Sequence, residues 1–216
     1  MKKQTFIFTL TKVDILTISG LFAGILSIGL ALSGRYSFSL ALLFIAMLID
    51  AMDGIVARKL GMESDFGRYL DGFVDVIDYL ISPALFLYLW GFNSWYYNPI
   101  LMIFVASGVI RLSVFNVIGN VKDDNDSLSY LGMPVFWSAL FLGVIYMASI
   151  FIAKEIVFPI IALYLLLSSV LMVYNKKFYK FKNWKAMLFV ILIFTAFFTI
   201  DGLGLLPRED LLLIKI

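Results

Sequence analysis

Long apolar runs, separated by short polar stretches, make up most of this sequence. The runs approach the ~20 residues that an α-helix needs to cross the hydrocarbon layer of a membrane. Because further runs follow the first one, that run is more typical of a retained transmembrane helix than of a signal peptide. Six or seven such segments can be read, at positions 14–32, 37–60, 70–90, 99–117, 134–153, 156–174 and 186–200.

The composition also indicates a membrane protein. The chain is 62% hydrophobic and 15% charged, whereas soluble domains are ~45–50% apolar and ~25% charged. Cysteine and histidine are absent, so any chemistry must use carboxylates, lysine, arginine, tyrosine or hydroxyl groups. No linker or internal repeat is visible, and we expect residues 1–216 to form one all-α integral membrane domain. Its expected surroundings are the lipid bilayer, with no nucleic-acid partner.

The basic residues favour one side of the membrane. Successive crossings place on the N-terminal side Lys2, Lys3, Lys12, Arg58, Lys59, Arg68, Lys122, Lys176, Lys177, Lys180, Lys182 and Lys185. The opposite side receives Arg35, Lys154 and Arg208. By the positive-inside rule, the N-terminus is expected in the cytoplasm. A site between the second and third helices would then open to the cytoplasmic face of the cytoplasmic membrane.

Positions 50–78 form the densest run of acidic residues within apolar sequence. Asp50 and Asp53 lie three residues apart on one predicted helix, and Asp71 and Asp75 lie four apart on the next. Both spacings put a pair of side chains on one helical face. Because the connection at 61–66 is short, the four carboxylates can converge on one cavity.

Carboxylates at this depth are costly, which points to a bound cation. One aspartate near the centre of a membrane helix costs ~2.5–3.5 kcal/mol, and neighbouring like charges repel. Arg58 and Arg68 are too few to neutralise the cluster. All-oxygen ligands select hard ions, so we expect Mg²⁺ or Mn²⁺, with Ca²⁺ as a possible substitute. A pair of ions held by carboxylates would suit phosphoryl chemistry.

The spacing of these residues resembles a family signature. The pattern is Asp50-x-x-Asp53-Gly54-x-x-Ala57-Arg58, eight residues, then Gly67-x-x-x-Asp71-x-x-x-Asp75. It is similar to the signature of the CDP-alcohol phosphatidyltransferases at every fixed position, a match expected by chance on the order of 10⁻⁹ per starting position. The resemblance implies a bundle of six transmembrane helices, usually a homodimer, with one or two extra C-terminal helices in some branches.

The resemblance also implies residue roles. Metal ligands would be Asp50, Asp53, Asp71 and Asp75, and CDP-binding residues would be Gly54, Ala57, Arg58 and Gly67. Asp75 would in addition be the catalytic base. Physical chemistry agrees, since metal ions on the pyrophosphate make CMP a better leaving group. An aspartate can accept the hydroxyl proton as the new O–P bond forms.

The second half resembles the phosphatidylserine synthase branch in the stretches 75–77, 82–84, 111–116 and 131–134. It departs from that branch at Asp78, Val114 and Phe136. The resemblance implies transfer of a phosphatidyl group from CDP-diacylglycerol, or from an archaeal CDP-lipid, to L-serine. Asp78 would then pair with the serine ammonium and Arg111 with its carboxylate.

Two alternatives stay open at this point. The same reaction could use glycerol phosphate, an inositol phosphate or an amino alcohol as the acceptor. A carboxylate-lined ion transporter is the alternative from another class of protein. Transporters tend to show internal repeats and helices broken near the membrane midplane, and this sequence shows neither.

Overall fold

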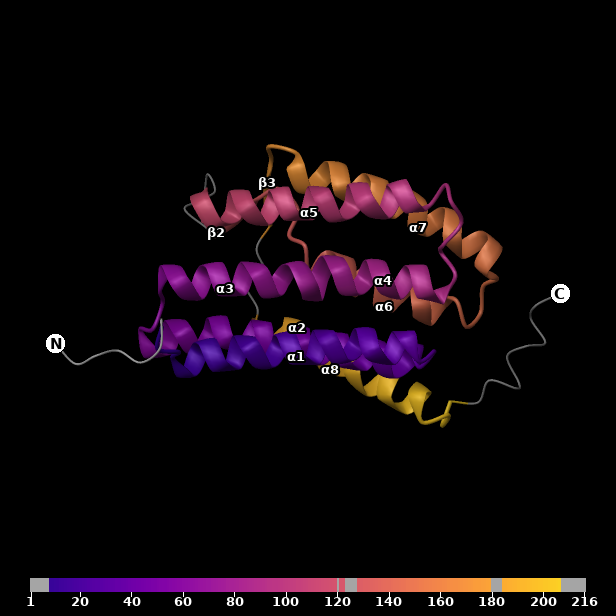
Figure 1. The fold of residues 1–216 in the computed structure, drawn as a ribbon, viewed down its shortest axis with the longest axis horizontal. Helices are drawn as coiled ribbons and strands as arrows, with labels where there is room; N and C mark the ends of the chain where they lie inside the picture. Colours follow the sequence, from indigo (N-terminus) through magenta and orange to yellow (C-terminus); the bar gives the residue numbers. More distant parts are fainter. Residues whose placement is uncertain (1–7, 120, 123–127, 180–183, 207–216) are drawn as a thin grey trace.

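The computed structural model describes residues 8–119, 121–122, 128–179 and 184–206 and is mainly helical (Figure 1). The helices are α1 (Lys12–Leu32), α2 (Tyr36–Leu60), α3 (Asp65–Asp75), the π-helical turn η1 (Val76–Ile81), α4 (Ser82–Trp90), α5 (Asn98–Ile118), α6 (Trp137–Ala148), α7 (Lys154–Val173) and α8 (Trp184–Gly202). Because α3, η1 and α4 run on as one crossing, 6 helices are long and apolar enough to span a membrane. The expected all-α membrane bundle is confirmed.

The segment predicted at 134–153 is the one that differs from a plain membrane helix. Its helix, α6, has only 12 residues, which corresponds to about 18 Å of helix. The residues before it are irregular, with a bend at Gly132 and a turn at Val135 and Phe136, and Met133 and Val135 are buried. Irregular backbone is tolerated at membrane depth where protein covers it. This part of the chain therefore consists of an irregular stretch followed by a short helix.

A small antiparallel sheet precedes that stretch. It consists of β1 (Val121–Lys122), β2 (Leu128–Leu131) and β3 (Lys177–Tyr179), in the order β1-β2-β3. Directly after β2, Gly132 has φ of +73° and its N–H donates to the Lys176 carbonyl at 3.0 Å. A side chain at Gly132 would collide with the carbonyl oxygen of Met172. Glycine thus lets the chain turn from the sheet and lie against the end of α7.

Small residues let α1 approach its neighbours closely. The buried face of α1 carries Gly20, Ala23, Gly24, Ser27 and Ala31, a spacing that suits helix packing in membranes. The Ser27 hydroxyl adds a hydrogen bond of 2.8 Å to a backbone carbonyl of α2. Figure 1 shows α1 lying along α2, with α3 and α4 between this pair and α5.

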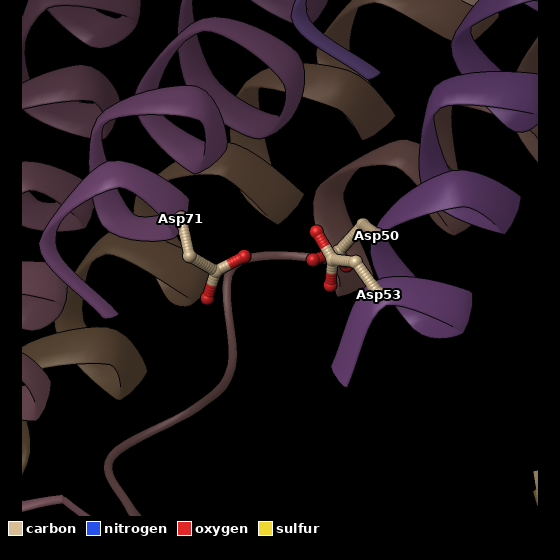
Figure 2. A group of neighbouring side chains, drawn as sticks. All are labelled: Asp50, Asp53 and Asp71. Carbon is tan, nitrogen blue, oxygen red and sulfur yellow. The ribbon is translucent and has the colours of Figure 1, made fainter. Parts of the chain in front are cut away.

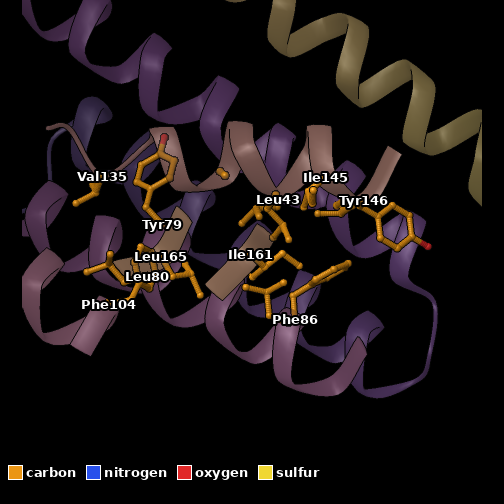
Figure 3. Packing of buried hydrophobic residues seen from close by; sticks show 14 of the residues in the cluster. Leu43, Tyr79, Leu80, Phe86, Phe104, Val135, Ile145, Tyr146, Ile161 and Leu165 are labelled. Atoms are coloured by element: carbon orange, nitrogen blue, oxygen red, sulfur yellow. The ribbon is translucent and has the colours of Figure 1, made fainter. Parts of the chain in front are cut away.

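Aromatic and aliphatic side chains fill the centre of the bundle (Figure 3). Phe86 of α4 packs edge-on against Tyr146 of α6, with ring centroids 5.6 Å apart. On the other side of α2, Phe44 stacks on Phe194 of α8 at 4.7 Å. Leu80, within η1, is fully buried in this cluster. The core therefore fixes η1, whose neighbours on the chain carry the acidic side chains.

Candidate active site

Three of the predicted aspartates meet between α2 and α3 (Figure 2). Asp50 and Asp53 project from α2 toward Asp71 of α3, and one carboxylate oxygen of each lies within 4.8 Å of the others. Asp53 is buried, whereas Asp50 and Asp71 are half-buried. The two helices are joined by a short connection, and the three-residue spacing on α2 puts Asp50 and Asp53 on one face, which meets Asp71.

Hydroxyl groups from two other elements hold this cluster. Thr17 of α1 donates a hydrogen bond of 2.5 Å to Asp53 Oδ2. Tyr79 of η1 donates one of 2.6 Å to Asp50 Oδ2. Sequence reasoning missed both residues. The available signal was a hydroxyl side chain within an otherwise apolar helical face, which is too common in membrane helices to single out a site.

The carboxylate cluster has no basic ion-pair partner within the part of the chain that the structure describes. Arg68 instead pairs with Asp65 at 2.9 Å, in an exposed position. Among the residues that the structure describes, no Lys or Arg forms an ion pair with Asp50, Asp53, Asp71 or Asp75. Carboxylates clustered in this way in a membrane protein repel one another, and a bound cation would offset their negative charge. The all-oxygen donor set fits a hard divalent ion.

A cavity of about 680 Å³ opens beside the cluster, at the end of the bundle where α1 and α3 begin and α2 ends. All four residues predicted to bind CDP line it, namely Gly54, Ala57, Arg58 and Gly67. Asp53 and Asp71 form its inner wall. Asp14, which caps the first turn of α1 with Thr11, also lines it and was not expected from the sequence. We call this space the outer cavity.

A second cavity, of about 280 Å³, adjoins the first and shares with it Asp53, Gly54, Arg58, Asp71 and Phe115. Its polar wall contains Asp50, Asp53, Asp71, Asp75, Tyr79 and Arg111. Its apolar wall includes Ile55, Phe136, Met187 and Ile191, so α8 contributes to it. We call this space the inner cavity. Asp53 and Asp71 line both spaces, and the carboxylate cluster therefore stands where the two cavities meet.

Asp75 and Asp78 occupy different surroundings. Asp75 lies one helical turn beyond Asp71 and lines the inner cavity, outside the compact group of three carboxylates. Asp78 lines neither cavity, is 2% exposed, and has no hydrogen-bond partner for either oxygen. Its carboxylate lies so close to Gly24 of α1 that a side chain there would clash with it.

The structure therefore does not bring Asp78 together with Arg111, although the sequence suggested that both contact the acceptor. In a regular α-helix Asp75 and Asp78 would share one face, because they lie three residues apart. Here Asp78 falls in the π-helical turn η1, whose i→i+5 bonding shifts each side chain around the axis. Asp78 turns toward α1, while Arg111 is 5% exposed and lines the inner cavity.

Comparison with known proteins agrees with this geometry. The CDP-alcohol phosphatidyltransferase family matches residues 10–202. An archaetidylserine synthase of Methanothermobacter thermautotrophicus is 31% identical over 160 residues, covering 72% of this chain and 66% of the relative. A CDP-diacylglycerol–serine O-phosphatidyltransferase of Methanocaldococcus jannaschii is 34% identical over 136 residues, covering 62% and 59%.

A protein of the same description from Helicobacter pylori is 30% identical over 186 residues, covering 83% of this chain and 77% of the relative. The chain thus spans a little less than two thirds of the first two relatives and more of the third. The family match covers the carboxylate cluster and both cavities. This chain belongs to the CDP-alcohol phosphatidyltransferase family.

Proposed function

We propose that this protein transfers the phosphatidyl group of a CDP-activated lipid to the hydroxyl of L-serine and releases CMP. The observation that carries the proposal is the carboxylate cluster at the place where the outer and inner cavities meet. The reaction needs such a junction, because a nucleotide, a lipid and a small alcohol must meet at one phosphorus atom. The relatives named as serine transferases support serine as the acceptor.

The outer cavity suits the nucleotide. Its volume of about 680 Å³ falls in the range usual for small-molecule sites, ~300–1,000 Å³. Gly54 and Gly67 leave room there, since a side chain at Gly67 would come within 3.1 Å of Ser64 Oγ. Arg58 is exposed at the cavity wall and can meet phosphate oxygens.

The inner cavity suits the acceptor and the lipid end of the donor. Its apolar wall, formed with α8, can contact the first atoms of a lipid, while its polar wall holds Asp75 and Arg111. The Arg111 guanidinium is a fitting partner for the serine carboxylate. We do not assign Asp78 a contact with the acceptor, because it lines neither cavity.

Mg²⁺ or Mn²⁺, as one ion or a pair, would be held by Asp50, Asp53 and Asp71, with Asp75 beside them. Ca²⁺ is the alternative ion. When bound, such ions neutralise the pyrophosphate and lower the basicity of the departing CMP. Thr17 and Tyr79 orient two of these carboxylates through their hydrogen bonds. Their role resembles that of the groups that orient metal ligands in other sites.

The reaction is a substitution at the lipid-side phosphorus of the pyrophosphate. The serine hydroxyl oxygen forms a bond to that phosphorus, and the bond from the phosphorus to the bridging oxygen of CMP breaks. Asp75, on the wall of the inner cavity, accepts the hydroxyl proton as the new bond forms. CMP leaves with the bonding electron pair into the outer cavity.

The site would face the cytoplasm. Lys12, Arg58, Lys59 and Arg68 lie at the end of the bundle that holds the outer cavity, whereas Arg35 and Lys154 lie at the opposite end. This bias follows the positive-inside rule. The cytoplasmic membrane is the expected location. A homodimer remains our expectation from the family resemblance.

Purified protein tests the proposal directly. We would supply labelled CDP-diacylglycerol, Mg²⁺ or Mn²⁺ and one acceptor at a time, and follow CMP release and the mass of the lipid product. Serine-dependent formation of phosphatidylserine, lost on chelation and regained with metal, is the expected result. A product only with glycerol phosphate, an inositol phosphate or an amino alcohol would refute serine as acceptor. No CMP release with any of these acceptors would refute the transferase.

A further inference from the structure

Arg111 lies beside two aromatic rings that face the inner cavity. Its guanidinium carbon is 5.0 Å from the ring centroid of Phe115, one turn along α5, and 5.5 Å from that of Tyr130 in β2. The two rings are 6.0 Å apart and inclined at 58°. All three side chains line the inner cavity. Cation–π contacts of this kind strengthen when water is excluded, and Arg111 is only 5% exposed.

The rings leave one edge of the guanidinium without a partner. Nε and Nη2 of Arg111 are buried and have no hydrogen-bond partner. Buried donors are almost always satisfied in proteins, so this unpaired pair favours the binding of an acceptor group at the edge. Nε–H and one Nη2–H point in parallel, and this edge matches the two oxygens of a carboxylate.

Tyr130 reaches Arg111 from outside the membrane helices. Its Cα pairs with that of Phe178 in β3, and the chain after it is fastened by the hydrogen bond from Gly132 to Lys176. Burial raises the pKa of the Tyr130 phenol, while the nearby positive charge of Arg111 lowers it. The net shift is upward, so the phenol stays neutral near pH 7 and the ring meets Arg111 as an uncharged aromatic.

We propose that Tyr130 is a positioning residue for the acceptor: with Phe115 it fixes the guanidinium plane of Arg111 so that the Nε–Nη2 edge binds the carboxylate of an amino-acid acceptor. This inference rests on the proposed transferase function and deepens it. Tyr130 itself need not touch the substrate. It acts by removing the rotations of Arg111 that would turn the edge away from the cavity.

The charge of the inner cavity favours a carboxylate over a phosphate. Arg111 and Arg58 are the cations among the described residues that line it. Arg58 is exposed and also lines the outer cavity, where the nucleotide phosphates are proposed to bind. That leaves one free guanidinium edge for the acceptor. A phosphorylated alcohol carries more negative charge and would stand close to Asp50 and Asp75 with a single arginine to offset it.

The test compares Tyr130→Leu with Tyr130→Phe in the serine assay. We expect Tyr130→Leu to raise the KM for serine about tenfold, the size of effect that a buried cation–π contact supports. Its KM for the CDP-lipid and its kcat should stay close to those of the unchanged protein. Tyr130→Phe keeps the ring and should keep the serine KM. Tyr174→Leu, which removes an exposed tyrosine outside both cavities, is the control.

A double-mutant cycle shows whether Tyr130 works through Arg111. Arg111→Lys keeps the charge but removes the planar edge, so it should raise the serine KM by itself. Adding Tyr130→Leu to Arg111→Lys should then cause little further loss, since interacting residues are not additive. Full additivity, or an unchanged serine KM in Tyr130→Leu, would overturn the inference while leaving serine transfer intact. An unchanged protein that transfers nothing to serine would instead overturn the proposed function.

Discussion

The phenol of Tyr79 donates a hydrogen bond of 2.6 Å to Asp50 Oδ2, joining η1 to α2 across 29 positions of sequence. Tyr79 follows directly after Asp78, whose carboxylate faces the opposite way, toward Gly24 of α1. The π-helical turn thus sends one polar side chain into the site and its neighbour out of it. Single π-helical turns often occur at functional sites, and here the turn contains the tyrosine that contacts Asp50.

Tyr79→Phe should weaken metal binding, because it removes the donor that orients Asp50. Loss of such an orienting group typically costs 10–100-fold in metal affinity or activity. We expect the Mg²⁺ or Mn²⁺ concentration for half-maximal activity to rise at least about tenfold. Tyr36→Phe is the matched control, since the Tyr36 hydroxyl donates to the Leu89 carbonyl away from both cavities. An equal effect of the two substitutions would argue against an orienting role for Tyr79.

Thr17→Val tests the second donor, which reaches Asp53 from α1. The change keeps the shape of the side chain and leaves one Asp53 oxygen without its hydrogen bond. We expect a similar rise in metal requirement, and recovery in Thr17→Ser, which restores a hydroxyl. Thr195→Val serves as the comparison, because the Thr195 hydroxyl donates to the carbonyl of Ile191 in its own helix, away from the cluster. A Thr17→Val enzyme with the metal dependence of the unchanged protein would contradict this account.

Asp75→Asn should abolish turnover without preventing CDP-lipid binding. The amide of asparagine cannot take up the proton of the serine hydroxyl. General base catalysis contributes ~10²–10⁴-fold to the reaction rate. We therefore expect kcat to fall at least about 100-fold, while binding of the CDP-lipid, measured by fluorescence or calorimetry, stays within a few-fold. Glu155→Gln, at the exposed start of α7, controls for loss of an acid elsewhere. Full turnover by Asp75→Asn would show that the assigned base is wrong.

Asp78→Asn tests whether Asp78 contacts serine, as the sequence suggested, or lies away from the acceptor, as the structure indicates. If Asp78 bound the serine ammonium, the substitution would raise the KM for serine strongly. Because Asp78 is buried against α1 and lines neither cavity, we expect the serine KM to change less than about threefold, well below the ~10-fold that corresponds to 1.4 kcal/mol. A large rise confined to the serine KM would restore the original hypothesis.

Gly24→Ala should destabilise the bundle at the same contact. The added methyl group would collide with Asp78 Oδ1. Overpacking of this kind costs about 1–3 kcal/mol, which a lowered thermal unfolding midpoint in detergent would report. Gly29→Ala is the control, because nothing lies within 4 Å of a side chain at that position of α1. Equal stability of the two variants would mean that α1 and η1 can separate at little cost.

The sequence by itself determined the membrane helices and the centre of the site. The apolar runs predicted each long helix to within a few residues, because length and hydropathy alone decide whether a helix suits the bilayer. The spacings within Asp50–Asp53 and Asp71–Asp75 are local, so helix geometry fixes which face they occupy. The outer-cavity residues Gly54, Ala57, Arg58 and Gly67 followed from the same signature.

Only the tertiary structure decided what surrounds those aspartates. Thr17, Tyr79 and Tyr130 contact the site across long stretches of sequence, and no local pattern marks them. Asp78 lies in a π-helical turn, which the hydrophobic periodicity of the sequence does not predict. The irregular stretch before α6 is likewise held by residues distant in sequence, since Gly132 and Met133 donate to the carbonyls of Lys176 and Leu171. Hydrophobic periodicity indicates which residues share a helix face, whereas the packing of the whole bundle determines which element contacts that face.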